Sequence, residues 1–520
     1  MQKGTMLSSL LYYRTRLAGG RQAVYDCDSR HSYTYDDLNV RANSLAAFLS
    51  QKLGLQKGER IGFCSDNHIA FIDAFFASYQ NGVMMTTYNA GLGVKMLREF
   101  IWRETPRVLF YSPKYRQQVE SLRAEYPDCV YIPLDGKPEA GDFCSYEDVV
   151  GYCPATPPVY EPPEMADIQM LVHTGGTTGS PKSAMLSFGA LYHNILSELL
   201  TLDLTSDDCA CVALPFYHTA AWNVLTLPLL MLGGRIVLMS RFDPCMLLQM
   251  IREQQPTVAM GVETIYMAIA AHPQFAETDF SCFRWMLSLA APTTRETMEK
   301  YWRKNIKLVS AFGMTEAGPN NIVMPAGKME LPELKKRWNC AGKPMFFNNI
   351  RIVDENGKDQ PDGVPGEMLF SGKLIFSGYW QDEENTRETL RDGWVHTGDI
   401  AYRDAEGFYY VCGRKKNMFI SGGENVFPIE IELALSEHPA VAYACVIGVP
   451  DSKWGEVGKA LIVKKQGMDT DKADIQEFVK RECSSIKVPK YIQFVTEIPK
   501  NAVGKTDLKT IHERYGYCGD

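Results

Sequence analysis

Short apolar runs alternate with longer stretches of helical spacing over the first part of the chain. The runs at 60–65, 82–87 and 107–112 have the length and continuous hydrophobicity of buried strands. Between them, 69–79 and 95–104 have the length and apolar spacing of helices. This alternation of strand and helix is typical of an α/β fold with parallel sheets.

The hydrophobic pattern changes after Gly342. Residues 350–353 and 366–371 read as short strands, the segment Asp354-Glu-Asn-Gly357 reads as a turn between them, and 407–412 continues the series. Strands joined by hairpin turns favour a meander. We predict a small β-barrel in this region.

A further unit begins after Arg414. Its pattern predicts helices over 428–437 and 471–486 and strands over 442–447 and 459–464. A chain of 520 residues exceeds the size of a single hydrophobic core. We therefore predict two domains: a large N-terminal domain over 1–413, with parallel-sheet α/β subdomains and the barrel, and a small, mobile α+β domain over 414–520.

The composition is typical of a soluble globular protein, with 45% apolar residues, 22% charged residues and a net charge of −8. The acidic balance gives no electrostatic case for binding nucleic acid. No apolar stretch approaches the roughly 20 residues of a membrane span, and the longest candidate, 224–232, is interrupted by Pro228. The 14 cysteines are scattered without the spacing of a zinc site. We expect a cytoplasmic protein with no integral membrane segment.

The segment 171–185 carries the most informative chemistry. Its three glycines allow positive φ and close approach of the backbone to a ligand, and its hydroxyls and one lysine can contact phosphate. The glycine spacing and Pro181 differ from a Walker loop, and an ordinary turn is the alternative interpretation. The candidate phosphate-binding residues are Thr174, Gly175, Gly176, Thr177, Thr178, Gly179 and Lys182.

Four later segments accompany this loop. They are Ala311-Phe-Gly-Met-Thr-Glu-Ala-Gly318, Trp394-Val-His-Thr-Gly-Asp399, Gly413-Arg-Lys-Lys416 with Ser421-Gly-Gly-Glu-Asn425, and Pro499-Lys-Asn-Ala-Val-Gly-Lys505. In this order the five motifs resemble the adenylate-forming superfamily, which includes acyl- and aryl-CoA synthetases, over nearly the whole chain. The resemblance implies activation of a carboxylic acid with ATP and Mg²⁺, release of pyrophosphate, and transfer of the acyl group to a thiol.

The resemblance also implies the catalytic roles. It places Thr315 near the α-phosphate, Glu316 on Mg²⁺, and Lys505 between the acyl carboxylate and the α-phosphate. A hard cation such as Mg²⁺ prefers oxygen ligands, and a positive charge beside both reacting groups stabilises the transition state. Taken alone, Glu316 would read as the start of a solvated helix and Lys505 as a surface charge.

The nucleoside contacts follow from the same resemblance. Asp399 matches a carboxylate that accepts hydrogen bonds from both ribose hydroxyls, and Arg414 matches a second ribose or phosphate contact. Phe312 stands where relatives usually have a tyrosine that stacks on adenine, so the ring face is kept and the hydroxyl is lost. The remaining expected nucleotide contacts are Gly313, Met314, Ala290 and Ala291.

Four further positions relate to transfer to the thiol. Lys416 matches the hinge about which the small domain of the family rotates. Gly422 and Gly423 match the wall of a tunnel for pantetheine, although Gly-Gly is also a common β-turn. His218 matches a position between the acyl pocket and the thiol entrance, and a simply packed histidine is the alternative.

The chain departs from the family where the acyl pocket is expected. Relatives commonly read Ser-Gly-Gly-Ala-Pro at the position of Ser288-Leu-Ala-Ala-Pro292, so the added side chains predict a shorter or flatter slot. Relatives also often read Gly-Val-Pro-Thr where this chain has Gly261-Val-Glu-Thr264. Glu263 should be exposed or paired, because burying an unpartnered charge is costly. The mostly apolar set of predicted pocket residues comprises Trp222, Asn223, Val262, Leu289, Ala290 and Asn320.

The leading prediction is an ATP-dependent acid–CoA ligase with coenzyme A as co-substrate, as a monomer or homodimer. A free-standing enzyme that loads the phosphopantetheine of a carrier protein uses the same motifs and stays open as an alternative. A non-catalytic nucleotide-binding pseudoenzyme is disfavoured because Lys505, Glu316 and the glycine loop are all present.

Overall fold

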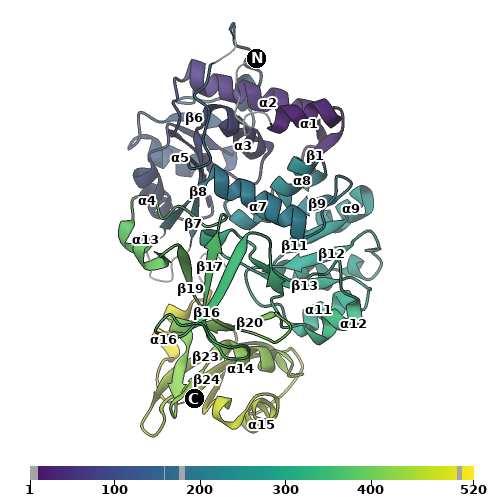
Figure 1. Cartoon of the computed structure of the whole chain (residues 1–520), viewed down its shortest axis with the longest axis vertical. Coiled ribbons are helices and arrows are strands. Elements are labelled where there is room, and N and C mark those ends of the chain that lie inside the picture. The colour runs from purple at the N-terminus through teal and green to yellow at the C-terminus, as the bar shows by residue number, and fades with distance from the viewer. Residues whose placement is uncertain (1–9, 157–158, 175–181, 501–505, 520) are drawn as a thin grey trace.

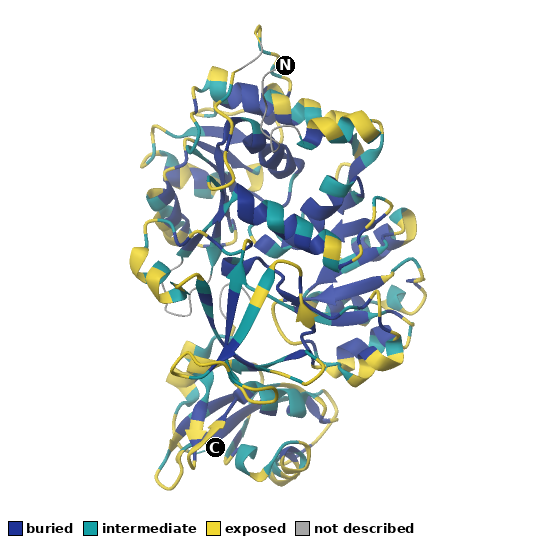
Figure 2. Cartoon of the chain, in the orientation of Figure 1, coloured by how far each residue is buried: buried dark blue, intermediate teal, exposed yellow. Residues whose placement is uncertain are grey.

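The computed structural model describes residues 10–156, 159–174, 182–500 and 506–519. Within this described part, the strands form four sheets (Figure 1). The first described helix, α1 (Leu10–Ala18), lies near the top of the view in Figure 1, and the C-terminal unit lies at the bottom. Figure 2 shows that the sheets are mainly buried while the outer faces of the helices are exposed.

A six-stranded sheet has the order β6-β5-β3-β4-β7-β8. Its first five strands in this order are parallel, and β8 is antiparallel to β7. The strands are β3 (Arg60–Cys64), β4 (Met84–Tyr88), β5 (Val108–Tyr111), β6 (Val130–Pro133), β7 (Ile168–Thr174) and β8 (Lys182–Ser187). Helices α3 (Ile69–Asn81) and α4 (Val94–Glu104) connect β3, β4 and β5. The strands and helices predicted in this region, and its parallel α/β character, are confirmed.

A nine-stranded sheet has the order β15-β14-β13-β12-β11-β9-β10-β1-β2. Its six central strands are parallel, and its three outer strands are antiparallel. The strands are β1 (Gln22–Asp26), β2 (His31–Thr34), β9 (Cys209–Val212), β10 (Arg235–Leu238), β11 (Val258–Gly261), β12 (Trp285–Ser288), β13 (Leu308–Phe312), β14 (Ile322–Val323) and β15 (Lys343–Pro344). Helices α9 (Pro244–Gln254), α10 (Glu263–Ala271) and α11 (Arg295–Trp302) connect the parallel strands.

One large apolar core joins these two sheets, because it contains residues of both and of the helices between them. The other helices of the large part are α1 (Leu10–Ala18), α2 (Tyr35–Ala47), η2 (Phe48–Lys52), η3 (Pro113–Tyr115), α5 (Arg116–Arg123), α6 (Tyr146–Val150), α7 (Phe188–Thr201), η4 (Ala221–Thr226), α8 (Leu227–Leu232), η5 (Pro273–Phe275), η6 (Thr315–Ala317), α12 (Leu331–Lys336) and α13 (Glu383–Thr389). Glu263 is paired as expected: its Oε1 accepts hydrogen bonds from the hydroxyls of Thr294 and Thr297, both 2.8 Å away.

The region predicted to be a barrel is an antiparallel five-stranded sheet. It consists of β16 (Asn348–Val353), β17 (Gly366–Gly372), β18 (Leu390–Arg391), β19 (Trp394–Arg403) and β20 (Tyr409–Arg414). Strand β19 is long enough to pair with β18 at its start and with β20 over its second half. Among the described residues no pairing joins β16 to β20. The predicted antiparallel meander is present, and its closure into a barrel stays a prediction.

The last sheet begins after β20. It consists of β21 (Phe419–Ser421), β22 (Glu424–Val426), β23 (Val441–Asp451), β24 (Gly455–Lys464) and β25 (Tyr491–Phe494), and its helices are η7 (Lys415–Asn417), α14 (Pro428–Ser436), α15 (Lys472–Glu482), η8 (Ser485–Lys487) and α16 (Leu508–Tyr515). The predicted strands and helices are present, with a longer β23–β24 hairpin and an earlier end of α15. The domain boundary at 413/414 stays a prediction.

A loop that contains η6 links β13 to β14 and carries most of the motif 311–318. The backbone N–H of Asn321 donates to the carbonyl of Phe312 over 2.9 Å, which folds the chain back on itself. A Cβ atom on Gly313 would lie 2.3 Å from the carbonyl oxygen of Pro319. Glycine is required here because the two backbone segments approach each other more closely than any side chain allows.

Gly313→Ala should therefore destabilise the fold. Overpacking against rigid backbone costs about 1–3 kcal/mol in free energy of unfolding, measured by chemical denaturation. Gly20→Ala is the matched control, because a Cβ there meets no atom within 4 Å. Equal stability changes in the two variants would contradict the steric argument.

Candidate nucleotide and acyl site

The candidate site lies where the first three sheets meet, and Tyr379 connects them. The Tyr379 hydroxyl donates a 2.7 Å hydrogen bond to Oε1 of Glu316, next to β13. The ammonium of Lys182, the first residue of β8, lies 5.0 Å from the centre of the Tyr379 ring. Tyr379 itself forms an antiparallel bridge with Ala184 of β8. Two predicted site residues are thus brought together by an aromatic residue that the sequence analysis missed.

Lys182 is held in place by a second contact. Its ammonium donates a hydrogen bond to Oδ1 of Asn385 on α13. Thr174, at the end of β7, pairs with Lys182 across the two strands. The glycines and hydroxyls between them, namely Gly175, Gly176, Thr177, Thr178 and Gly179, lie outside the described residues, so the structure fixes the two ends of the predicted phosphate loop.

Glu316 suits a site in which Mg²⁺ is bound jointly by the protein and by a nucleotide. Its side chain is buried, and one carboxylate oxygen is oriented by Tyr379. The described residues contain no group of three or more acidic, histidine or cysteine side chains that could hold a metal ion by themselves. Mg²⁺ in nucleotide sites commonly uses one or two carboxylates together with phosphate oxygens and water. Glu316 therefore fits Mg²⁺ that arrives with ATP.

Thr315 lies beside the segment that leads into η4. Its hydroxyl lies 3.1 Å from that of Thr219, so either oxygen can donate. His218, the neighbouring residue, is exposed, and its ring lies 4.6 Å from that of Tyr217. The predicted catalytic threonine and the predicted thiol-entrance histidine therefore belong to adjoining segments.

Asp399 and Arg414 form the predicted ribose pair. They are direct partners across β19 and β20, and Nε of Arg414 lies 2.8 Å from Oδ1 of Asp399. The other carboxylate oxygen, Oδ2, is buried and has no hydrogen bond from any described residue. Burial raises the pKa of Asp399 to about 6, while Arg414 lowers it and Glu367 raises it. An oriented carboxylate with one unoccupied oxygen can accept hydrogen bonds from ribose hydroxyls.

The remaining predicted nucleotide residues lie at strand ends of the nine-stranded sheet. Phe312 is the last residue of β13, and its ring lies 6.2 Å from that of Phe370 on β17. Gly313 and Met314 follow it in the loop that contains η6. Ala290 and Ala291 are exposed after β12, and Ala290 has φ of 70°, a left-handed conformation that favours glycine. The strained backbone at Ala290 coincides with the departure from the family pattern.

The predicted acyl-pocket residues are mainly buried. Trp222 is fully buried, stacks on Phe216 with ring centres 4.2 Å apart, and donates from its indole N–H to the Phe216 carbonyl over 2.7 Å. Leu289 is 3% exposed and belongs to the large core. Asn223 and Asn320 are also buried, and Val262 is partly buried against the same core. Their assignment to the acyl pocket stays a prediction.

The thiol-transfer residues lie around the start of the last sheet. Lys416 is an exposed residue of η7, between β20 and β21. Gly422 and Gly423 both have positive φ and form the two-residue turn of the β21–β22 hairpin, a conformation that suits glycine. Gly422 lies against the ring of Trp454, because a Cβ there would be 2.7 Å from it. Lys505 lies outside the described residues.

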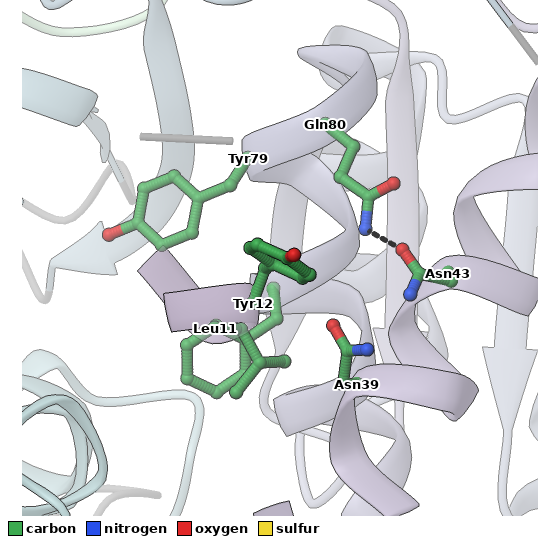
Figure 3. Close-up of a pocket in the computed structure, with 7 residues that line it drawn as sticks. Leu11, Tyr12, Asn39, Asn43, Tyr79 and Gln80 are labelled. Carbon is green, nitrogen blue, oxygen red and sulfur yellow. Dashed lines mark hydrogen bonds between the residues drawn. The ribbon is translucent and has the colours of Figure 1, made fainter. Parts of the chain in front are cut away.

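One cavity of about 120 Å³ lies away from the motif residues. It is lined by side chains of α1, α2 and α3, and Figure 3 shows the hydrogen bond from Gln80 to Asn43 at its edge. None of the predicted site residues lines it. Among the described helices, none combines the length and apolarity needed to cross a membrane.

Comparison with known proteins identifies the family of this chain. Residues 13–380 match the model of the AMP-binding enzyme family, and residues 430–505 match the AMP-binding enzyme C-terminal domain. The chain belongs to the AMP-binding enzyme family. It is an AMP-forming acid–thiol ligase that uses ATP, with a carboxylic acid and coenzyme A as its other substrates.

Individual relatives match this ligase over most of their length. A feruloyl-CoA synthase of Amycolatopsis sp. is 35% identical over 487 residues, which cover 93% of this chain and 94% of the relative. An indoleacetate–CoA ligase of Aromatoleum aromaticum is 30% identical, with 91% of each chain covered. The structure of ATP-bound MatB from Rhodopseudomonas palustris superposes with a TM-score of 0.87, at 28% identity and 98% coverage of both chains.

The raised pKa of Asp399 predicts a pH dependence of nucleoside binding. Below about pH 6 the carboxyl of the free ligase is protonated and loses acceptor capacity, so affinity should fall as the pH falls. Between about pH 7.5 and about pH 5 the Kd for adenosine should rise about tenfold, because protons compete for the same oxygen. Adenosine is the probe because it carries no titrating phosphate, and calorimetry is the measurement.

Asp399→Asn is the control for this pH effect. It should bind adenosine more weakly throughout but without the change between pH 7.5 and pH 5, since the amide does not titrate. The same pH dependence in Asp399→Asn and the unmodified ligase would rule out Asp399 as the titrating group.

Proposed function

We propose that this ligase activates an aromatic carboxylic acid of the arylalkenoic type and transfers it to coenzyme A. The observation that carries the proposal is the match, over nine-tenths of the chain, to relatives named for feruloyl and indoleacetyl acids. The replacement of two glycines by Leu289 and Ala290 supports it, since added side-chain atoms favour a shorter or flatter slot. A flat aromatic acid fits such a slot better than a long alkyl chain.

The proposed chemistry assigns a task to each residue group. The ends of the glycine loop, including Lys182, hold the β- and γ-phosphates, and Glu316 binds the Mg²⁺ that accompanies them. Mg²⁺ neutralises phosphate charge when bound. Asp399 and Arg414 hold the ribose, and Phe312 stacks on the adenine. Lys505 then places its positive charge beside the acyl carboxylate and the α-phosphate, where charge changes as pyrophosphate leaves.

Transfer to the thiol follows in this proposal. Rotation about Lys416 would withdraw Lys505 and bring the hairpin turn at Gly422 and Gly423 to the thiol entrance near His218. Loading of a carrier protein, the cytoplasmic location and the monomeric or homodimeric state stay predictions.

A first experiment separates the two half-reactions. Lys505→Ala should lower acyl-adenylate formation by about two or more decades, because it removes a cation from the transition state. Thioester formation from a pre-made acyl-adenylate should change far less. Rapid quench measures each half-reaction, and unchanged adenosine binding verifies the fold. Equal losses in both steps would show that Lys505 does not serve the adenylation step.

A second experiment tests the acid. Pyrophosphate release should be fastest with hydroxycinnamic and cinnamic acids and should require no coenzyme A for a single turnover. Alkanoic acids from C4 to C16 serve as the comparison set. Each methylene bound in an apolar pocket is worth about 0.8 kcal/mol, so a true fatty-acid pocket would give kcat/KM that climbs steeply with chain length. Such a climb, with no aromatic turnover, would refute the aromatic assignment.

A further inference from the structure

A pair of buried polar side chains lies behind the adenylation motif. Glu198 is on the inner face of α7, and Asn320 follows η6 by three residues. Both are 0% exposed, and the Asn320 amide donates to Oε2 of Glu198 over 3.1 Å. Among the described residues, no cation lies beside Glu198 to offset the cost of burying it.

Each member of this pair keeps one oxygen without a partner. Oε1 of Glu198 and Oδ1 of Asn320 are buried and have no partner within hydrogen-bond distance among the described residues. Asn223, on the η4 helix that packs against α7, likewise has a buried Oδ1 without a partner in the described chain. Leaving such a group buried without a partner costs free energy, so several in one region indicate a purpose other than stability.

The protonation of Glu198 decides which chemistry the pair offers. Burial raises the pKa of Glu198 well above its usual range, against lowering by Asn320 and by Asn194 one helical turn earlier. The raised pKa favours the neutral carboxylic acid, whose O–H group can donate a hydrogen bond. Oδ1 of Asn320 is an acceptor. A hydroxyl group both donates and accepts, so it can satisfy the two unpartnered oxygens at once.

The position of the pair connects it to the reacting groups. Asn320 lies four residues after Glu316, in the loop whose start holds Thr315. Asn223 lies four residues after Thr219, whose hydroxyl is 3.1 Å from that of Thr315. Asn223 lies within η4, which has π-helical hydrogen bonding. Such helices occur frequently at functional sites. The loop that holds Thr315 and the segment that holds Thr219 thus also carry the unpartnered oxygens of Asn320 and Asn223.

We infer that Glu198 and Asn320, with Asn223, form the polar end of the acyl pocket and bind a hydroxyl group on the aromatic acid, far from its carboxylate. The pair selects hydroxylated aromatic acids over the same acids without the hydroxyl. This inference rests on the proposed function, because it presupposes an aromatic acid. It adds the substituent that the ligase recognises and the residues that recognise it.

The test is the ratio of kcat/KM for 4-hydroxycinnamate to that for cinnamate, measured by pyrophosphate release. A site that hydrogen-bonds a substrate hydroxyl leaves buried polar groups unpaired when the hydroxyl is missing. The ratio should be about tenfold or more in the unmodified ligase. In Glu198→Leu it should fall to about one, because the substrate hydroxyl then loses the partner that distinguishes it from cinnamate. Asn320→Leu should lower the ratio in the same way.

Tyr79→Phe is the matched control. Tyr79 is also buried with an unpartnered hydroxyl, but it lines the cavity of Figure 3 and not the adenylation motif. Its loss should leave the ratio unchanged. Adenosine binding and thermal unfolding establish that each variant is folded, and where Glu198→Leu does not fold, Asn320→Leu carries the same test.

The outcomes separate the two proposals. No turnover of either aromatic acid, together with turnover of alkanoic acids, overturns the proposed function. Turnover of both aromatic acids with a ratio near one in the unmodified ligase overturns the hydroxyl site and leaves the proposed function standing. An unchanged high ratio in the folded variants also overturns it, and a ratio lost equally in Tyr79→Phe assigns the effect to general packing.

Discussion

The hydrogen bond between Tyr379 and Glu316 is the contact on which the site depends. Three sheets that are far apart in sequence supply the site, and the bond fixes β13 of the nine-stranded sheet against the segment that leads from β17 to α13. Lys182 over the Tyr379 ring adds the six-stranded sheet. The Tyr379 side chain is 6% exposed, so water competes little for its hydroxyl, and the hydrogen bond to a carboxylate is of the stronger, charge-assisted kind.

Local pattern was sufficient to predict much of the fold. The runs that became β3, β4 and β5 are apolar on both faces, as parallel strands covered by helices must be, and their connecting helices follow directly. Closure of the meander into a barrel could not be decided from the sequence, for a non-local reason. Whether a meander closes depends on which strand each edge meets, and the ten-residue β19 serves two neighbours at different ends. No spacing within the individual strands carries that information.

The candidate site was predictable only in part, for similar reasons. Asp399 and Arg414 stand in separate motifs, and the register of β19 with β20 makes them partners. Tyr379 gave little signal, because an aromatic residue between glycine and tryptophan reads as ordinary packing. Glu198 was missed because a single acid in a helix is usually solvent-exposed. The available clue was Asn194 four residues earlier, which puts two polar side chains on one otherwise apolar face.

Partly exposed ion pairs link the unit of the last sheet to the rest of the chain. Lys465 pairs with Glu296 at 2.8 Å and Arg295 with Glu437 at 3.6 Å, and all four side chains are roughly one-third to one-half exposed. Exposed pairs of this kind contribute about 0–1 kcal/mol each. A small apolar cluster of Ile400, Cys412 and Phe427 adds burial next to the proposed hinge. Because these ion pairs are weak, breaking them in the proposed rotation about Lys416 would cost little free energy. The buried polar groups of the site, by contrast, belong to the large part, where they would stay assembled while the small part moves.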